Sequence, residues 1–187
     1  MTAPAPPHLD EADQQELLRL ARATLVHFTH HHETPRLESD RPALNRPAAA
    51  FVTVYVRGHL RGCIGRLEPD QPLVRTVAEL TVSAAARDPR FPPVAAEEVG
   101  DARLEISVLD DFRRVDDVET IEIGRHGLII GRGHHRGLLL PKVAVEHRMD
   151  RETFLAETCW KAGLDSDAWR RPGTTIESFV AQVFAEA

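Results

Sequence analysis

Apolar residues recur every three or four positions across residues 11–32, and this spacing predicts a long amphipathic helix. Asp10 stands just before it, where a carboxylate can accept hydrogen bonds from the first backbone N–H groups of the helix. The same spacing predicts a second helix that starts near residues 70–72 and ends before Asp88. A third helix is predicted over about residues 150–162.

Runs of β-branched and alternating residues predict strands between these helices. Residues 49–56 and 60–64 lie on either side of residues 58–59, which predicts an antiparallel hairpin with a two-residue turn. In that register Val54 lies opposite Cys63 on the neighbouring strand. A bulge in the hairpin would change this pairing.

Three further segments have recognisable patterns. Residues 104–109 alternate between apolar and polar side chains, so we expect a strand with Glu105 and Ser107 on one face. Two short apolar runs within residues 127–140 flank a basic tip and predict a second hairpin. The last apolar residues, within 174–184, are spaced more like a helix than a strand.

The chain of 187 residues is long enough for one packed core that can divide into two lobes. We expect residues 1–9, which are rich in proline and alanine, to form a disordered tail, and residues 10–187 to form the domain. A net charge of −6 and an aromatic content of 5% disfavour nucleic-acid binding, which requires a basic surface and stacking side chains.

Features of the whole chain also predict its location. No apolar run approaches the roughly 18 residues that a membrane span requires, so we expect no membrane association. Residues 1–7 have neither a positive region nor an apolar core, and we therefore expect no signal peptide. Cys63 and Cys159 show no pairing pattern, which favours reduced thiols in a cytoplasmic protein.

Cys63 is the main candidate for chemistry. It lies in residues 60–65 (LRGCIG), and the predicted alternation places Arg61 on the same face of the strand. In one interpretation, Arg61 and backbone N–H groups left accessible by Gly62 and Gly65 favour the thiolate and make Cys63 a nucleophile. In the other, Cys63 is a small apolar side chain in a turn whose glycines are needed for geometry. The residues alone leave both interpretations open.

Other polar side chains could join such a site: Asp88, Arg90, Glu105 and His126. His126 is the best candidate for proton transfer because an imidazole ordinarily titrates near neutral pH. Structural roles are equally available to these residues. The chain lacks the usual phosphate-loop, dinucleotide-binding and serine-hydrolase motifs. Its histidines form no recognisable metal-binding pattern, so the sequence predicts no metal and no cofactor.

The hexapeptide LRGCIG resembles the signature of the AMMECR-like domain family. Further blocks resemble the family in the same order along the chain, at residues 83–93 (SAAARDPRFPP), 107–109 (SVL), 124–128 (GRHGL) and 139–146 (LLPKVAVE). The resemblance extends over about residues 12–184 and therefore covers nearly the whole chain.

This resemblance implies an α+β fold with two unequal lobes, in which mainly antiparallel strands pack with helices. It implies a strand in the terminal segment, against the helical spacing noted above. Bacterial and archaeal members resemble the first component of the AmmeMemoRadiSam group. The implied partners are a Memo-like protein, similar to metal-dependent dioxygenases, and a radical-SAM protein. The resemblance implies no settled activity.

Together these observations predict a small-molecule-handling or catalytic component with a pocket around residues 60–65. Cys63 is its predicted nucleophile. The residues predicted to bind the small molecule are Arg61, Gly62, Gly65, Asp88, Arg90, Glu105 and His126. The alternative is a non-catalytic adapter that docks a protein or peptide on the same segment. RNA or DNA binding through the arginines is a third and less favoured hypothesis.

Overall fold

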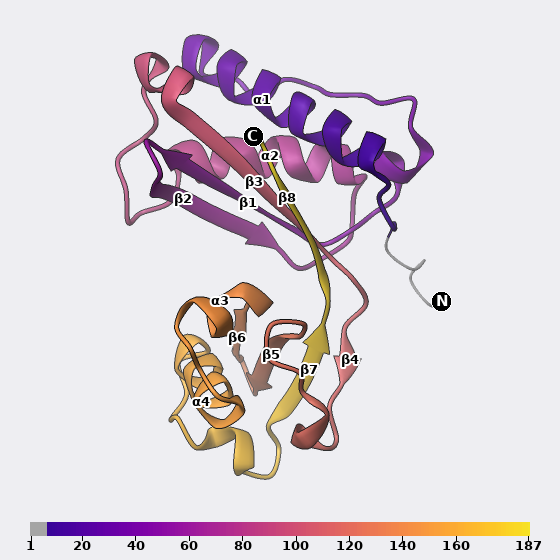
Figure 1. Ribbon diagram of the computed structural model, residues 1–187, viewed down its shortest axis with the longest axis vertical. Coiled ribbons are helices and arrows are strands. Elements are labelled where there is room, and N and C mark those ends of the chain that lie inside the picture. Colours follow the sequence, from indigo (N-terminus) through magenta and orange to yellow (C-terminus); the bar gives the residue numbers. More distant parts are fainter. Residues whose placement is uncertain (1–6) are drawn as a thin grey trace. The chain divides into compact units, whose positions relative to one another are not determined.

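The computed structural model describes residues 7–187. Residues 1–6, which make up most of the predicted tail, lie outside the described residues. The chain forms two units (Figure 1). Unit 1 contains the chain up to Leu109 together with Gln182–Ala187, and unit 2 is Asp110–Ala181. Each unit has its own antiparallel sheet and helices, which confirms the predicted α+β class.

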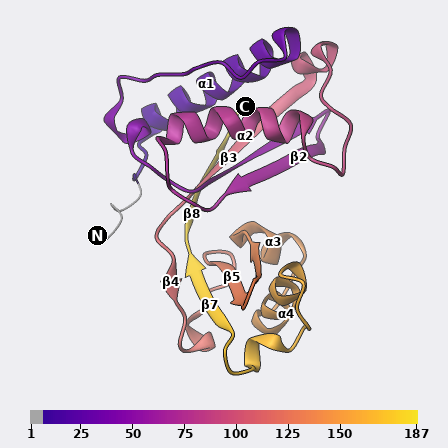
Figure 2. The same cartoon turned by 180° about the vertical axis from the view of Figure 1, so that it is seen from behind.

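Unit 1 is a four-stranded sheet with two helices on one face. The strand order is β2-β1-β3-β8. The strands are β1 (Ala50–Val56), β2 (His59–Arg66), β3 (Ala102–Leu109) and β8 (Ala181–Ala185). The helices are α1 (Glu11–His31) and α2 (Leu73–Ala86), with short 3-10 turns η1 (Pro42–Asn45) and η2 (Ala96–Asp101). Figure 2 shows α2 in front of β1 and β2, which it covers.

The first helix begins where the sequence predicts. The Asp10 side chain accepts a hydrogen bond from the Asp13 N–H at 2.7 Å, and the Asp13 side chain accepts one from the Asp10 N–H at 3.2 Å. This reciprocal pair satisfies backbone donors that the helix itself leaves free. The apolar stripe is buried in the core of unit 1, with Leu17 and Leu25 fully enclosed.

The β1–β2 hairpin differs from the predicted register. The turn is formed by Arg57 and Gly58, both with positive φ, rather than by residues 58–59. Tyr55 pairs with Leu60, but the next pair joins Val54 to Gly62, so Arg61 is an extra residue in a bulge. Cys63 therefore lies opposite Thr53, and the prediction that it faces Val54 is wrong.

This register decides which side chains share a face of the sheet. Val52 and Val54 are buried with the helices in the core of unit 1. Because side chains alternate along a strand, Thr53 lies on the opposite face. Its cross-strand partners are Cys63 on β2 and Glu105 on β3. A row of three polar or reactive side chains thus crosses the face that points away from α1 and α2.

The terminal segment forms strands, as the resemblance implies, and the helix favoured by spacing is wrong. β7 (Thr175–Phe179) pairs within unit 2, and β8 lies beside β3 in unit 1. Gln182 exchanges hydrogen bonds with the Leu9 backbone at 3.0 and 3.1 Å, and Glu186 pairs with Arg22. Leu9, which the sequence assigns to the tail, is buried in the core.

Unit 2 contains a second four-stranded sheet, in the order β4-β7-β5-β6. Its other strands are β4 (Arg113–Arg114), β5 (Gly127–Arg132) and β6 (His135–Leu139). Its helices are α3 (Pro141–Glu146) and α4 (Arg151–Lys161), with short turns η3 (Val118–Thr120) and η4 (Ala168–Arg170). The predicted second hairpin and third helix are both present. Within residues 7–187, no helix is long and apolar enough to cross a bilayer.

Candidate functional site

The Cys63 thiol lies on the edge strand β2 and is half-buried. The hydroxyl of Thr53 donates a hydrogen bond to the Cys63 sulfur at 3.1 Å. Thr53 is itself buried, so its hydroxyl is a fixed dipole aimed at the sulfur. Sequence reasoning missed Thr53 because the predicted register placed Val54 there. The turn at Arg57 and Gly58, taken together with the bulge at Arg61, places Thr53 there.

The backbone of Cys63 is held by a carboxylate. On an edge strand, one N–H in two points away from the sheet and lacks a strand partner. The Cys63 N–H donates to Asp88 Oδ2 at 2.9 Å. Asp88 follows the end of α2, and its side chain is only 3% exposed. This bond therefore ties the end of a helix to the strand that carries the thiol.

Arg90 completes the arrangement. Its Nε and Nη2 donate to the two Asp88 oxygens at 2.9 and 2.7 Å, and the Arg90 side chain remains 53% exposed. The Arg90 hydrogen bonds hold the pKa of Asp88 far below its ordinary value, with further help from the backbone N–H groups of Cys63 and Arg90. The hydrogen bonds to Asp88 raise the pKa of Arg90 in turn. The structure thus brings Cys63, Asp88 and Arg90 together.

Low pH should reduce the stability that the ionised Asp88 carboxylate contributes through its bonds with Arg90. A carboxyl whose folded pKa is depressed adds stability above its unfolded value, here 3.8, and that stability is lost as the pH falls below it. Asp88→Asn should lower the free energy of unfolding by about 2 kcal/mol at pH 7, because the charged bonds with Arg90 are lost. In urea titrations, the difference in the free energy of unfolding between Asp88→Asn and the unmodified protein should become smaller below pH 3.8. A constant difference from pH 7 to pH 2 would contradict this assignment.

Arg61 has a different environment from the one predicted. Its Nε donates to the Pro92 carbonyl at 2.8 Å and its Nη2 to the Pro93 carbonyl at 3.0 Å. Both Glu98 oxygens accept from Nη1 and Nη2, at 2.9 and 2.8 Å. The guanidinium thus connects the bulge in β2 to the loop at Pro92 and Pro93 and to the η2 turn, which contains Glu98. The role of Arg61 in binding a small molecule stays a prediction. A bound molecule would have to compete with these four hydrogen bonds of the guanidinium.

We expect Arg61→Lys to destabilise the protein almost as much as Arg61→Ala. An ammonium cannot supply the planar fork that reaches Glu98 and two carbonyls together. Either change should cost about 1.5–3 kcal/mol, the usual value of charge-assisted hydrogen bonds. Urea unfolding followed by circular dichroism measures this, with Arg19→Lys on the exposed surface of α1 as the control. If Arg61→Lys is as stable as the unmodified protein, the planar guanidinium geometry of Arg61 does not contribute to stability.

The two glycines that flank Cys63 are required by packing. A Cβ on Gly62 would lie closer than 3.0 Å to the backbone carbonyl of Ala84 in α2. A Cβ on Gly65 would also lie closer than 3.0 Å, in this case to the ring of Phe51. These contacts explain both glycines without a ligand, and the predicted binding role of Gly62 and Gly65 stays a prediction.

Two other predicted residues have different placements. Glu105 lies on the same face as Cys63, and Thr53 stands between them. Two strand spacings separate Glu105 from Cys63, which is about 10 Å. His126 belongs to unit 2, where its Nδ1 accepts a hydrogen bond from the Glu122 N–H at 3.1 Å. That His126 joins the thiol site stays a prediction.

The remaining cysteine and the acidic and histidine side chains offer no second centre. Cys159 is 0% exposed in the core of unit 2, and burial raises the pKa of its thiol. Among residues 7–187, no three His, Cys, Asp or Glu side chains are grouped so that they could hold a metal ion.

Comparisons with known proteins agree with the fold and with the family that the sequence resembles. The AMMECR1 family model matches residues 18–184. A protein of Methanothermobacter thermautotrophicus is 42% identical over 185 residues, covering 95% of this chain and 96% of its own. One of Methanopyrus kandleri is 44% identical over 182 residues, covering 91% and 86%. The crystal structure of an uncharacterised Pyrococcus horikoshii protein, 37% identical, superposes with a TM-score of 0.91 over 95% of this chain and 93% of that one. The chain therefore belongs to the AMMECR1 family.

Proposed function

We propose that this protein is a cytoplasmic, small-molecule-handling component whose reactive group is the Cys63 thiol. One observation carries the proposal: the thiol receives a hydrogen bond from a buried hydroxyl, while the backbone of the same residue is anchored to the Asp88–Arg90 pair. A cysteine that only filled space would need neither the Thr53 hydroxyl nor a cation nearby. The arrangement fixes the sulfur and places the Asp88–Arg90 ion pair next to the residue that carries it.

The chemistry open to such a thiol is nucleophilic. After the thiol proton passes to solvent, the sulfur attacks an electrophilic carbon and an S–C bond forms. The bond from that carbon to its leaving group breaks, and the leaving group departs with the electron pair. The exposed guanidinium of Arg90 favours an anionic substrate or leaving group. In this proposal Glu105, on the same sheet face as Cys63, assists in binding the small molecule.

We further propose a Memo-like protein and a radical-SAM protein as partners, because the chain resembles the first component of that three-protein group. A specific alternative is that the same segment is a docking surface without chemistry. Leu60, next to the bulge, is 39% exposed, and an apolar side chain on an edge strand suits a protein or peptide contact.

Two matched variants separate the alternatives. The tagged protein is expressed in the source organism with its own gene deleted, and the co-purified proteins and the restoration of the deletion phenotype are both scored. We expect Cys63→Ser to retain the Memo-like and radical-SAM partners but to fail to restore function. Leu60→Ser should behave as the unmodified protein in both respects.

If the segment is a docking surface without chemistry, the two variants should exchange their behaviour. Leu60→Ser would lose the partners, and Cys63→Ser would restore function fully. That pair of outcomes would overturn the proposed chemistry. Co-purification of neither partner would overturn the proposed assembly.

A further inference from the structure

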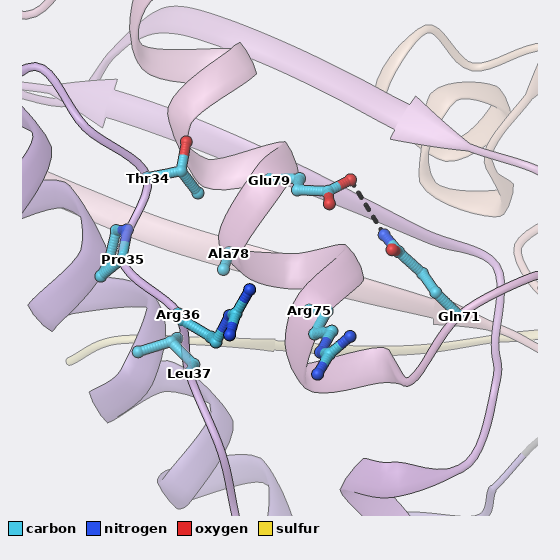
Figure 3. Close-up of a pocket in the computed structure, with 8 residues that line it drawn as sticks. All are labelled: Thr34, Pro35, Arg36, Leu37, Gln71, Arg75, Ala78 and Glu79. Atoms are coloured by element: carbon cyan, nitrogen blue, oxygen red, sulfur yellow. Dashed lines mark hydrogen bonds between the residues drawn. The ribbon is translucent and has the colours of Figure 1, made fainter.

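Unit 1 contains a pocket of about 350 Å³ that is separate from the thiol (Figure 3). One wall is the connection after α1, with Pro35 and Leu37, and the other is the N-terminal half of α2, with Ala78. The pocket belongs to the helix layer, whereas the Cys63 side chain lies on the sheet face that points away from the helices. Pockets for small organic molecules begin near 300 Å³, so this volume suits a small ligand.

Two arginines line the pocket without protein partners. Figure 3 shows Arg36 extending from the connection towards α2, and Arg75 on the helix itself. Within residues 7–187, neither guanidinium makes a hydrogen bond or ion pair. Glu79, the acidic residue of the pocket, is engaged elsewhere: it accepts from Gln71 at 2.9 Å and from Arg66 at 3.4 Å. Two exposed arginine side chains without protein partners therefore line one small pocket.

The position of Arg75 is not explained by helix stability. It lies in the first turn of α2, where the helix dipole disfavours a cation. That turn contains no acidic residue to offset the charge. Glu79 is four residues further along α2, but it bonds Gln71 and Arg66 instead of Arg75. A negatively charged ligand would provide the anionic partner for Arg75 that the protein itself does not provide.

We propose that this pocket binds the phosphate group of a small phosphate monoester. Arg36 and Arg75 clamp the phosphate oxygens, since the guanidinium fork matches that geometry. Two cations match a dianion better than the single charge of a carboxylate. The apolar wall of Pro35, Leu37 and Ala78 contacts the carbon skeleton of the ester. This site goes beyond the proposed thiol chemistry and does not depend on it.

The test is a calorimetric titration of the full chain at pH 7.5, where a phosphate monoester is largely dianionic. The probes are phenyl phosphate, inorganic phosphate and benzoate at constant ionic strength. We expect saturable binding of phenyl phosphate, with inorganic phosphate weaker because it lacks the apolar part. Benzoate should be weaker than phenyl phosphate by about tenfold or more, the usual value of one charged hydrogen bond. Absence of saturable binding, or equal affinity for benzoate, would overturn the proposal.

Charge-removing variants locate the site. Arg36→Gln and Arg75→Gln should each weaken phenyl phosphate binding by about tenfold. Arg87→Gln, which removes the same charge at the other end of α2, should leave the affinity unchanged. Cys63→Ala should also bind normally, which separates this site from the thiol site. Equal weakening by Arg36→Gln, Arg75→Gln and Arg87→Gln would mean nonspecific attraction and would overturn the assignment.

Discussion

Replacing Gly62 with alanine is expected to destabilise the protein by more than about 3 kcal/mol, at the upper end of the cost of overpacking. The new methyl group would lie closer than 3.0 Å to the Ala84 carbonyl oxygen. That oxygen belongs to the backbone of α2 and cannot rotate away as a side chain can. Relief requires α2 to move from β2, which would also strain the bond between Asp88 and the Cys63 N–H.

Two other glycines serve as controls for this prediction. Gly100→Ala should change the free energy of unfolding by less than about 0.5 kcal/mol, because a Cβ there meets nothing within 4 Å. Gly65→Ala should be intermediate, since the Phe51 ring that it meets can turn. Urea unfolding followed by circular dichroism measures the stabilities of the three glycine variants and so tests this ranking. If Gly62→Ala and Gly100→Ala unfold at the same urea concentration, the close approach of β2 to α2 is not a constraint.

This result would also bear on the meaning of the hexapeptide. Gly62 and Gly65 have packing explanations, and the Arg61 side chain fastens a loop. Among Arg61, Gly62, Cys63 and Gly65, Cys63 is then the residue whose contacts a structural role alone does not explain. The hexapeptide therefore combines structural requirements with a single candidate reactive group.

The sequence predicts well those features that depend on neighbouring residues. The cap formed by Asp10 and the start of α4 after Asp150 follow from residues three positions apart. The alternation in β3 correctly places Glu105 and Ser107 on one face, since they pair with Thr53 and Phe51. Each of these depends on local backbone geometry, which short patterns encode directly.

Features that depend on distant contacts could not be predicted in this way. The spacing of Ile176 and Phe179 fits a helix, yet the segment is extended because its partners are β5 and β3. Likewise, the turn at Arg57 and Gly58 and the bulge at Arg61 together shift the pairing and bring Thr53 rather than Val54 to the thiol. Neither the sheet partner of a strand nor a bulge is visible in a local pattern.

The second large effect expected is a difference in reactivity between the two thiols. In the native protein at pH 7, iodoacetamide should label Cys63 at least about 100-fold faster than Cys159. Cys63 is half-buried on the sheet surface, whereas Cys159 is 0% exposed and burial raises the pKa of its thiol. Alkylation of Cys159 therefore requires local unfolding. Mass spectrometry of peptides resolves the two sites.

Variants around Cys63 test whether its surroundings activate it. Thr53→Val removes the hydroxyl that donates to the sulfur, and Arg90→Gln removes the nearby positive charge. Each should slow the labelling of Cys63 by about 3- to 10-fold, the equivalent of one weak to moderate polar interaction. Thr29→Val and Arg19→Gln, both on α1, are the matched controls and should leave the rate unchanged.

The most direct test is therefore the labelling rate of Cys63 at pH 7 in the unmodified protein, in Thr53→Val and in Arg90→Gln, each confirmed as folded. An accessible thiol activated by its neighbours predicts rapid labelling that both substitutions slow. A Cys63 as inert as Cys159, or one whose rate neither substitution changes, would contradict it. The hexapeptide would then be a structural element, and the docking alternative would stand.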